Sequence, residues 1–252
     1  MATCFHKGFE IEPKAIIWRF TSFKYLLEMI EKGEVYFPSA RQFNDPWEGS
    51  LAIPDSSLGQ STMDRSVLHI VARGLEEQRF SRAFEQLCRL TKIHCWQIAD
   101  EEIPAMWARY GREIATVAMR STVGGLMRGL KDFRLQPQFG CEDVHVGAVR
   151  YIHFERERMQ DRSASGRFFH KDVSFSYERE LRAVVSLRSS EEFGVDVPEK
   201  GVMVPVDLKE VIDSVRVSPL APNRLLTQLK EIVTAAGLPW DVDFSRCLRA
   251  FS

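Results

Sequence analysis

The chain has 252 residues, of which 44% are hydrophobic and 27% are charged, and its formal net charge is −1. This composition can bury a substantial core and is typical of a globular protein. A net charge near zero argues against a surface built mainly to neutralise nucleic-acid phosphates, although it leaves room for a local basic groove. We expect neither a signal peptide nor a membrane span, because no apolar run reaches the required length.

Cysteine usage points to a reducing compartment. The five cysteines are odd in number, widely spaced and without a Cys-x-x-Cys pair. A disulfide framework or a zinc ribbon is therefore not expected. Reduced thiols in a cytoplasm fit this pattern best.

The first elements of the chain are predicted from strong local signals. Residues 14–20 predict a strand because they are rich in β-branched and aromatic side chains. A hydroxyl at Thr21 or Ser22 can cap a following helix, whose apolar face ends at Gly33. A short strand at residues 34–37 comes next, and residues 39–49 then predict a loop.

The remaining elements follow from hydrophobic periodicity. In chain order we predict two helices between about residues 61 and 90, a short strand at 93–97, helical turns at 104–110, a strand at 113–119, a helix at 121–130, a strand at 144–152, a charged helix within 154–167, a long strand at 177–187, strands at 203–206 and 214–217, and a helix at 223–236. Strands and helices mix without regular alternation. This favours a single α+β domain over residues 1–252, with a mixed or antiparallel sheet and flanking helices.

Common catalytic signatures are absent from the sequence. It contains no P-loop, no Gly-x-Gly-x-x-Gly, no His-Glu-x-x-His and no Gly-x-Ser-x-Gly. The six histidines are scattered, and the adjacent His94 and Cys95 fit a structural pair better than a metal site. We therefore expect no metal cofactor.

Two features near the N-terminus could bind an anion or a polar ligand. Arg19 lies on a strand that leads into a helix start, where its planar guanidinium could hold a phosphate. The alternative is an edge arginine paired with a carboxylate. Asn44 and Asp45, in Phe43-Asn-Asp-Pro-Trp-Glu48, could bind a ligand or could only shape the turn.

Two further features lie later in the chain. Aromatic residues in Cys95-Trp-Gln97 and in Met106-Trp107-Ala-Arg-Tyr110 are more typical of core than of a ligand platform. Glu178, Glu180 and Arg182 would share one face of the long predicted strand. Neighbouring carboxylates repel, which raises at least one pKa, and such pairs occur where cationic transition states are stabilised. A solvated strand face with arginine partners is the alternative.

These pieces together resemble the bacterial "domain of unknown function 2971" family. The matching elements run, in order, as Trp18-Arg-Phe-Thr-Ser22, Leu27-x-x-Ile30-x-x-Gly33, Phe43-Asn-Asp-Pro-Trp-Glu48, Cys95-Trp-Gln97, Met106-Trp-x-x-Tyr110 and Tyr177-Glu-x-Glu-x-Arg182. The likeness covers about residues 14–190. Residues from about 200 to 252 would form a C-terminal extension of strands and a helix.

A looser resemblance is to the ADP-ribosyltransferase superfamily. It rests on Arg19, the helix to Gly33 with the strand at 34–37, and Glu178-x-Glu180, in that order. The resemblance implies a split sheet and NAD as substrate, with Glu180 bonding the nicotinamide ribose and stabilising the oxocarbenium charge, and Glu178 positioning the acceptor. The residues it would assign to NAD binding are Arg19, Thr21, Ser22, Asn44, Asp45, Trp107, Tyr110 and Arg182. The chain departs from the pattern in its middle strand, which carries His94-Cys-Trp-Gln97 instead of Ser-Thr-Ser or tyrosine.

Three functions remain open at this point. The first is an NAD-consuming enzyme that transfers ADP-ribose to a protein or nucleic acid, or hydrolyses NAD, in a bacterial toxin or phage-defence role. The second is a non-catalytic module that binds a nucleotide or nucleic acid, with a basic patch in residues 150–167. The third is a metal-dependent nuclease, which would require Asp45, Glu48, Glu178 and Glu180 to converge.

Overall fold

A computed structural model describes residues 3–45, 47–52, 82–110 and 115–247. Its strands are β1 (Thr3–Phe5), β2 (Ile16–Ser22), β3 (Glu34–Pro38), β4 (Thr91–Ile98), β5 (Thr116–Thr122), β6 (Val144–Ala148), β7 (Arg150–Ile152), β8 (His170–Asp172), β9 (Glu180–Ser186), β10 (Gly201–Pro205), β11 (Ser214–Val217) and β12 (Asp241–Phe244). The helices are α1 (Phe23–Lys32), α3 (Pro104–Tyr110), α4 (Val123–Gly129), α5 (Arg188–Glu192), α6 (Leu208–Val211) and α7 (Asn223–Ala235), with 3-10 turns η1 (Ala40–Gln42), η4 (Gly166–Phe169) and η5 (Val173–Glu178). Residues 82–90 are also helical.

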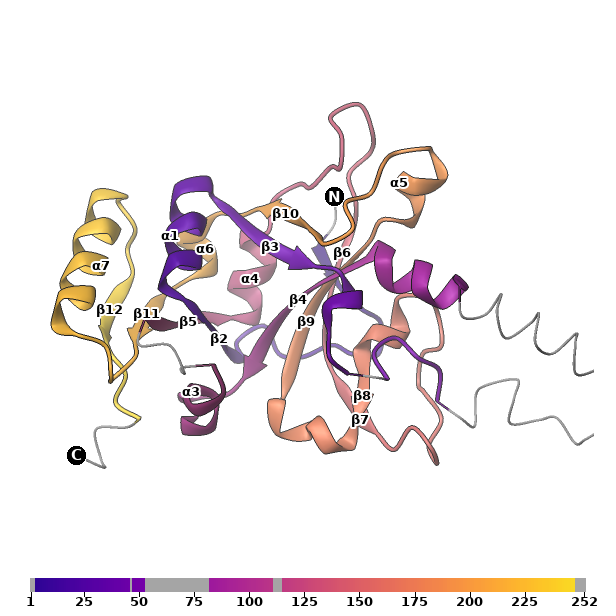
Figure 1. Ribbon diagram of the computed structural model, residues 1–252, viewed down its shortest axis with the longest axis horizontal. Helices are drawn as coiled ribbons and strands as arrows, with labels where there is room; N and C mark the ends of the chain where they lie inside the picture. Colours follow the sequence, from indigo (N-terminus) through magenta and orange to yellow (C-terminus); the bar gives the residue numbers. More distant parts are fainter. Residues whose placement is uncertain (1–2, 46, 53–81, 111–114, 248–252) are drawn as a thin grey trace, which may run out of the picture.

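Eight strands form one sheet in the order β1-β6-β9-β4-β2-β5-β11-β12 (Figure 1). The pairs β1–β6 and β11–β12 are parallel, and the other neighbouring strands are antiparallel. The strands β3 and β10 form a small sheet, and β7 and β8 form another. The predictions of an α+β fold and of a mixed sheet with flanking helices are therefore confirmed.

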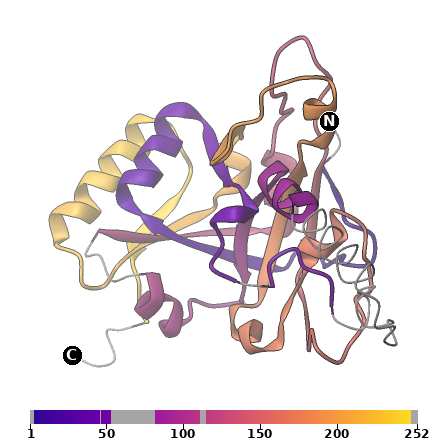
Figure 2. The same ribbon diagram turned by 45° about the vertical axis from the view of Figure 1, so that its right-hand side comes forward.

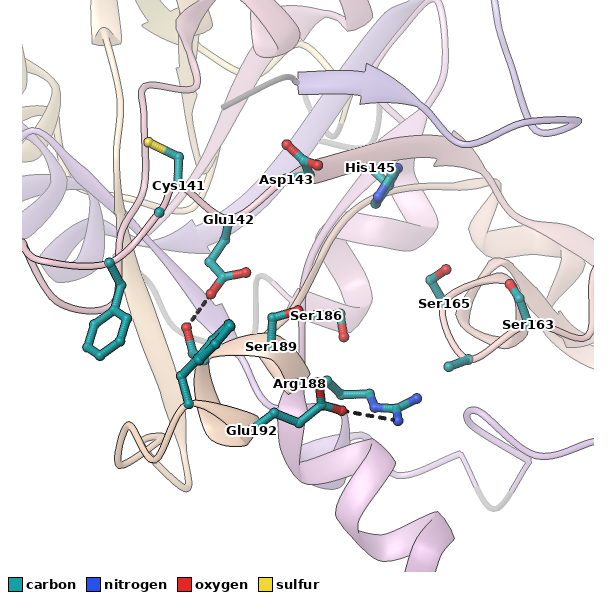
Figure 3. Close-up of a pocket in the computed structure, with 15 residues that line it drawn as sticks. Cys141, Glu142, Asp143, His145, Ser163, Ser165, Ser186, Arg188, Ser189 and Glu192 are labelled. Carbon is teal, nitrogen blue, oxygen red and sulfur yellow. Dashed lines mark hydrogen bonds and ion pairs between the residues drawn. The ribbon is translucent and has the colours of Figure 1, made fainter.

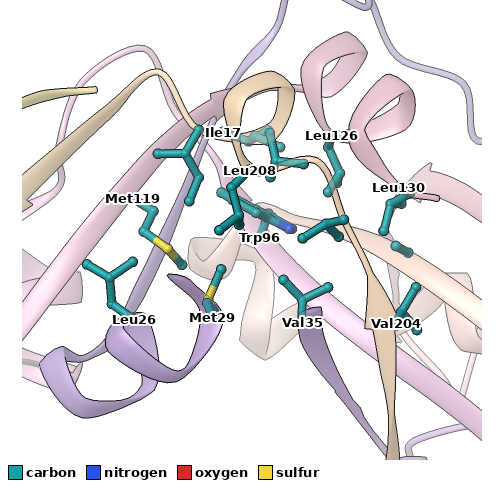
Figure 4. Packing of buried hydrophobic residues seen from close by; sticks show 14 of the residues in the cluster. Ile17, Leu26, Met29, Val35, Trp96, Met119, Leu126, Leu130, Val204 and Leu208 are labelled. Atoms are coloured by element: carbon teal, nitrogen blue, oxygen red, sulfur yellow. The ribbon is translucent and has the colours of Figure 1, made fainter. Parts of the chain in front are cut away.

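The two faces of the sheet carry different layers. Along β2, Ile17 belongs to the large core shared with α1, α4, α6 and α7, whereas Trp18 and Phe20 pack with α3. Figure 4 shows Leu26 and Met29 of α1 directed toward the sheet. Figure 2 shows α1 and α7 on one side and α3 on the other. Alternation of side chains along β2 thus separates a thick helical layer from the face that carries α3.

The start of the chain folds as its local signals predict. The Oγ of Ser22 accepts a hydrogen bond from the backbone N–H of Tyr25 at 3.2 Å, which caps α1. Gly33 ends the helix with φ of 63°, a left-handed conformation that glycine adopts without a steric penalty. The strand and helix predicted here are confirmed, and β2 extends through Thr21 and Ser22 because both pair with β5.

Several predicted elements need correction in the middle of the chain. The long strand predicted at 177–187 begins only at Glu180, because residues 173–178 form a 3-10 turn and Arg179 is left-handed with φ of 45°. Glu178 therefore does not lie on the strand. The strand predicted at 144–152 is two strands in different sheets, β6 and β7. The charged helix predicted within 154–167 is wrong, because residues 153–165 form turns and bends.

Other predictions hold with shifted boundaries or fall outside the described residues. The helix predicted at 121–130 is the shorter α4, since its first two residues continue β5. The strand predicted at 113–119 is β5, shifted toward its C-terminus, and its first two predicted residues lie outside the described part of the chain. The helices predicted between 61 and 90 also lie outside it, apart from 82–90. The C-terminal strands β11 and β12 continue the main sheet. None of the described helices is long and apolar enough to cross a membrane.

Lys92 is a fully buried cation in the core of the fold. Its Nζ donates hydrogen bonds to the carbonyl oxygens of Arg89 at 2.6 Å and Pro198 at 2.7 Å. Burial, with a smaller contribution from the positive charge of Arg89, lowers the pKa of Lys92 to about 8. Lys92 thus ties β4 to the segment before β10 while it carries a charge that the interior disfavours.

We expect the free energy of unfolding of the wild type to rise relative to that of Lys92→Met between about pH 8 and about pH 10. In that window the unfolded lysine is protonated and the folded one is neutral, so proton release favours the folded state. Urea unfolding of both proteins across this range measures the difference. A difference that stays constant with pH would show that Lys92 titrates normally in the folded protein.

Candidate functional site

The main sheet opens between β2 and β4. These strands pair only at Ile17–Ile98 and at Trp18–Gln97, whereas β2 pairs along its whole length with β5. A cavity of about 140 Å³ lies at this opening. It is lined by Trp18, Arg19, Phe20, Cys95, Trp96, Gln97, Met106, Tyr110, Glu178 and Glu180.

The cavity brings together four of the residues predicted from the sequence. They are Arg19, Tyr110, Glu178 and Glu180, which come from β2, α3, η5 and the start of β9. The other predicted residues do not line it: Thr21, Ser22, Asn44, Asp45, Trp107 and Arg182. Segments that are distant in the sequence thus meet at one point of the sheet.

Arg19 crosses the opening between the two strands. Its Nη1 donates a hydrogen bond to the carbonyl oxygen of Cys95 on β4 at 2.5 Å. Its buried Nε has no hydrogen-bond partner among the described residues. The guanidinium is therefore held at one end, while its Nε–H donor is left without an acceptor among the described residues.

Glu180 is a buried carboxylate held by two cations. Its Oε1 accepts from Lys171 Nζ at 2.7 Å, and its Oε2 accepts from Arg182 Nε at 2.6 Å. Burial opposes ionisation of Glu180, but the charges of Arg182 and Lys171 hold its pKa well below the usual range. Glu180 is therefore a fixed anion at the edge of the cavity.

The pKa of Glu178 is shifted in the opposite direction to that of Glu180. Burial, together with a hydrogen bond to Glu180, raises its pKa, while Lys171 acts against that rise. One oxygen of Glu178 bonds Lys171 Nζ, and the other lies 2.7 Å from Arg109 Nη1. The two carboxylates predicted as a pair thus do lie together, but Lys171 bridges them and their pKa values are driven apart.

Arg182 holds the site from behind and is fully buried. It bonds both oxygens of Glu48, at 2.7 and 2.9 Å, and donates to the carbonyl oxygen of Phe168 at 2.7 Å. Its Nε, Nη1 and Nη2 each donate to a protein acceptor, so the guanidinium is fixed by the surrounding fold.

The mouth of the cavity carries an arginine between two tyrosines. The guanidinium carbon of Arg109 lies 5.6 Å from the ring centroid of Tyr110 and 5.7 Å from that of Tyr177. Arg109 also bonds the hydroxyl of Tyr177. Trp107 points away from this group: it packs edge-on against Phe20 at 5.0 Å and is buried.

The remaining predicted residues have local structural roles. The Oδ1 of Asp45 accepts from the backbone N–H of Trp47 at 2.9 Å, which shapes the turn. Ser22 caps α1, and Thr21 extends β2 opposite Val117. The loop containing Asn44 is nevertheless connected to the site, because it carries Glu48 to Arg182.

Sequence reasoning missed Lys171 and Arg109 as members of this site, and it considered Glu48 only as a metal ligand. Lys171 lies in a three-residue strand, His170–Asp172, that matches no motif. Glu48 lies 134 positions before its partner Arg182 in the chain. Together the segments 43–48 and 177–182 hold four acidic and two basic residues. This excess was the signal available, since buried carboxylates require cationic partners.

A larger cavity of about 610 Å³ lies elsewhere, beside α5 and β6 (Figure 3). Two pairs of its lining residues contact each other: Ser190 donates a hydrogen bond to Glu142, and Arg188 Nη2 lies 3.6 Å from Glu192 Oε1. His145, on its wall, has the thiol of Cys4 at 3.5 Å. No buried side-chain atom without a partner lines it among the described residues, so the smaller cavity is the better candidate site.

No metal site is evident in the part of the chain that the structure describes. There, no three side chains among His, Cys, Asp and Glu are placed to hold a metal ion. The carboxylates that do converge are Glu48, Glu178 and Glu180, and each is paired with an arginine or a lysine. Asp45, the fourth carboxylate considered for a nuclease, does not line the cavity.

Comparison with known proteins gives little further guidance. No family model matches the chain, and no curated protein matches it. Among solved structures the chain is similar to "Thermus sp. 2.9 DarT in complex with ADP-ribosylated ssDNA", with a TM-score of 0.40 and 9% identity over 98% of each chain. A TM-score this low supports no functional assignment. The resemblance to the "domain of unknown function 2971" family stays a prediction.

Replacing Arg182 with Met is expected to lower the free energy of unfolding by about 3–5 kcal/mol, because Glu48 then remains buried without its cation and Glu180 keeps only Lys171 of its two cations. The matched control is Arg188→Met, which removes an exposed ion pair and should cost less than about 1 kcal/mol. Urea unfolding measures both variants. Equal losses in the two would show that Arg182 is not the cation on which the buried cluster depends.

Proposed function

We propose that the chain is an enzyme that cleaves the bond between nicotinamide and ribose in NAD and passes ADP-ribose to an acceptor or to water. The observation that carries this proposal is the convergence of Arg19, Glu178 and Glu180 on one cavity at the opening of the sheet. In this reaction the C–N bond breaks and its electron pair leaves with nicotinamide. A lone pair of the acceptor then forms the new bond to the ribose carbon, and the acceptor loses a proton.

Glu180 is suited to stabilise the positive charge that develops on the ribose. A fixed anion acts most strongly when it is already in place, since no reorganisation is then needed. Lys171 and Arg182 each occupy one of its oxygens. A carboxylate offers about four acceptor sites, so Glu180 keeps capacity for the ribose hydroxyls.

Arg19 is suited to the pyrophosphate. Its contact with Cys95 orients the guanidinium, and its Nε remains available. A planar guanidinium binds phosphate oxygens through charge-assisted hydrogen bonds. Arg19 would thus hold the anionic part of NAD at the opening while the nicotinamide end occupies the cavity.

Glu178 is suited to take the proton from the acceptor. A general base works best when its pKa approaches the operating pH, and burial raises the pKa of Glu178. It also lies nearer the mouth than Glu180, since it bonds the partly exposed Arg109. This assignment separates the roles of the two carboxylates by their environments.

Substituting Glu180 with Gln should reduce nicotinamide release from NAD by about 100-fold or more, because the fixed negative charge is lost. Release is measured with purified protein, alone and with cell lysate as a source of acceptors. Glu192→Gln, an exposed change on α5, is the matched control and should leave release unchanged. Thermal unfolding of each variant separates lost activity from lost fold. Absence of release by the wild type under all conditions would overturn the proposal in favour of a non-catalytic nucleotide-binding module.

The pH profile of the reaction tests the role of Glu178. Activity should fall on the acidic side at a pH above the usual carboxyl pKa of about 4.3, because a base with a raised pKa is protonated there. Glu178→Gln should abolish this acidic limb and lower the rate of transfer to acceptors. An acidic limb that persists in the variant would assign it to another group.

A further inference from the structure

Gln97 has a buried side-chain amide without a hydrogen-bond partner in the described part of the chain. Its side chain is 3% exposed and lines the cavity at the opening of the sheet. Neither its Oε1 nor its Nε2 has a hydrogen-bond partner among the described residues. A buried amide without partners is costly, so this donor and this acceptor indicate a ligand that supplies one of each.

The cavity around Gln97 has the size of one aromatic ring. Its volume is about 140 Å³, and an apolar cavity of about 150 Å³ is large enough to hold benzene. The apolar part of its wall comes from Trp18, Phe20 and Met106. These apolar side chains with the amide of Gln97 beside them fit a ring that carries one polar substituent, while Arg19, Glu178 and Glu180 supply the charged part of the wall.

The register of the sheet puts this amide beside the catalytic anion proposed above. Gln97 is the Cα partner of Glu180 on β9 and of Trp18 on β2. Of the two β4 residues that pair with β2, Gln97 is therefore the one next to the opening. A ring bound at Gln97 would lie next to Glu180, where its bond to ribose breaks.

We infer that Gln97 binds the carboxamide of the nicotinamide ring and sets a preference for the amide over the carboxylate of nicotinic acid. This inference rests on the proposed function and names the residue that selects its substrate. A primary carboxamide offers an N–H donor to Oε1 and an oxygen acceptor to Nε2, so two hydrogen bonds form head to tail. A carboxylate offers acceptors only, leaves Oε1 unpaired and faces the negative charge of Glu180.

Binding of small aromatic amides to the full chain tests this inference. Isothermal titration with nicotinamide, nicotinic acid, benzamide and benzoic acid gives the two amide-to-acid affinity ratios. We expect the wild type to prefer each amide by about tenfold or more, and Gln97→Met to lose both preferences. Gln138→Met, an exposed change of the same type, should retain them. Gln97→Met should melt at or above the wild-type temperature, since it removes an unsatisfied buried amide.

The outcomes separate this inference from the proposed function. NAD turnover with equal binding of amides and acids, or with preferences unchanged in Gln97→Met, overturns the role of Gln97 and leaves the reaction standing. Amide binding that depends on Gln97 without NAD turnover supports Gln97 and overturns the reaction. If none of the four aromatic compounds binds, the inference that this cavity holds an aromatic ring is overturned.

Discussion

The fully buried guanidinium of Arg182 governs the arrangement of the site. A charge removed from water requires neutralising partners at hydrogen-bond distance, and here they come from β9, from the loop before residue 50 and from the 3-10 turn η4. Three segments are thus fixed around one cation. The hydrogen bond from Arg182 Nε orients the carboxylate of Glu180. Lys171 Nζ then links Glu180 to Glu178. The position of Glu180, the anion to which we assign catalysis in the proposed function, is therefore fixed by the same charges that hold the fold.

The opening between β2 and β4 provides a cavity beside this charge cluster. If β2 and β4 paired along their whole length, backbone would fill the space beside Glu180. Because these strands pair at only two positions, a small cavity remains there. Arg19 on β2 reaches β4 through a side-chain hydrogen bond to the carbonyl oxygen of Cys95, and not through backbone pairing. At this point the Nε of Arg19 and both ends of the Gln97 amide are buried and have no hydrogen-bond partner among the described residues.

The fold was more predictable from the sequence than the site. The cap at Ser22 and the left-handed Gly33 are local signals, and the structure has both. The start of β9 at Glu180 was not predicted, because Arg179 adopts a left-handed conformation that glycine usually occupies and that no local sequence rule predicts for arginine. The contact of Glu48 with Arg182 depends on tertiary packing across 134 positions. Gln97 was named only within a motif, since an unsatisfied amide becomes visible only when its neighbours are known.

The strand order has a consequence for how the chain reaches this structure. Of the neighbouring strands in the main sheet, only β11 and β12 follow each other with no other described strand between them in the chain. Every antiparallel ladder in that sheet therefore closes a long loop before it gains any hydrogen bonds. Such high contact order makes folding slow, because chain entropy is lost before native contacts compensate for it. Folding of this protein should thus be governed by the late joining of distant segments, with β4 and β9 completing the site only as the centre of the sheet assembles.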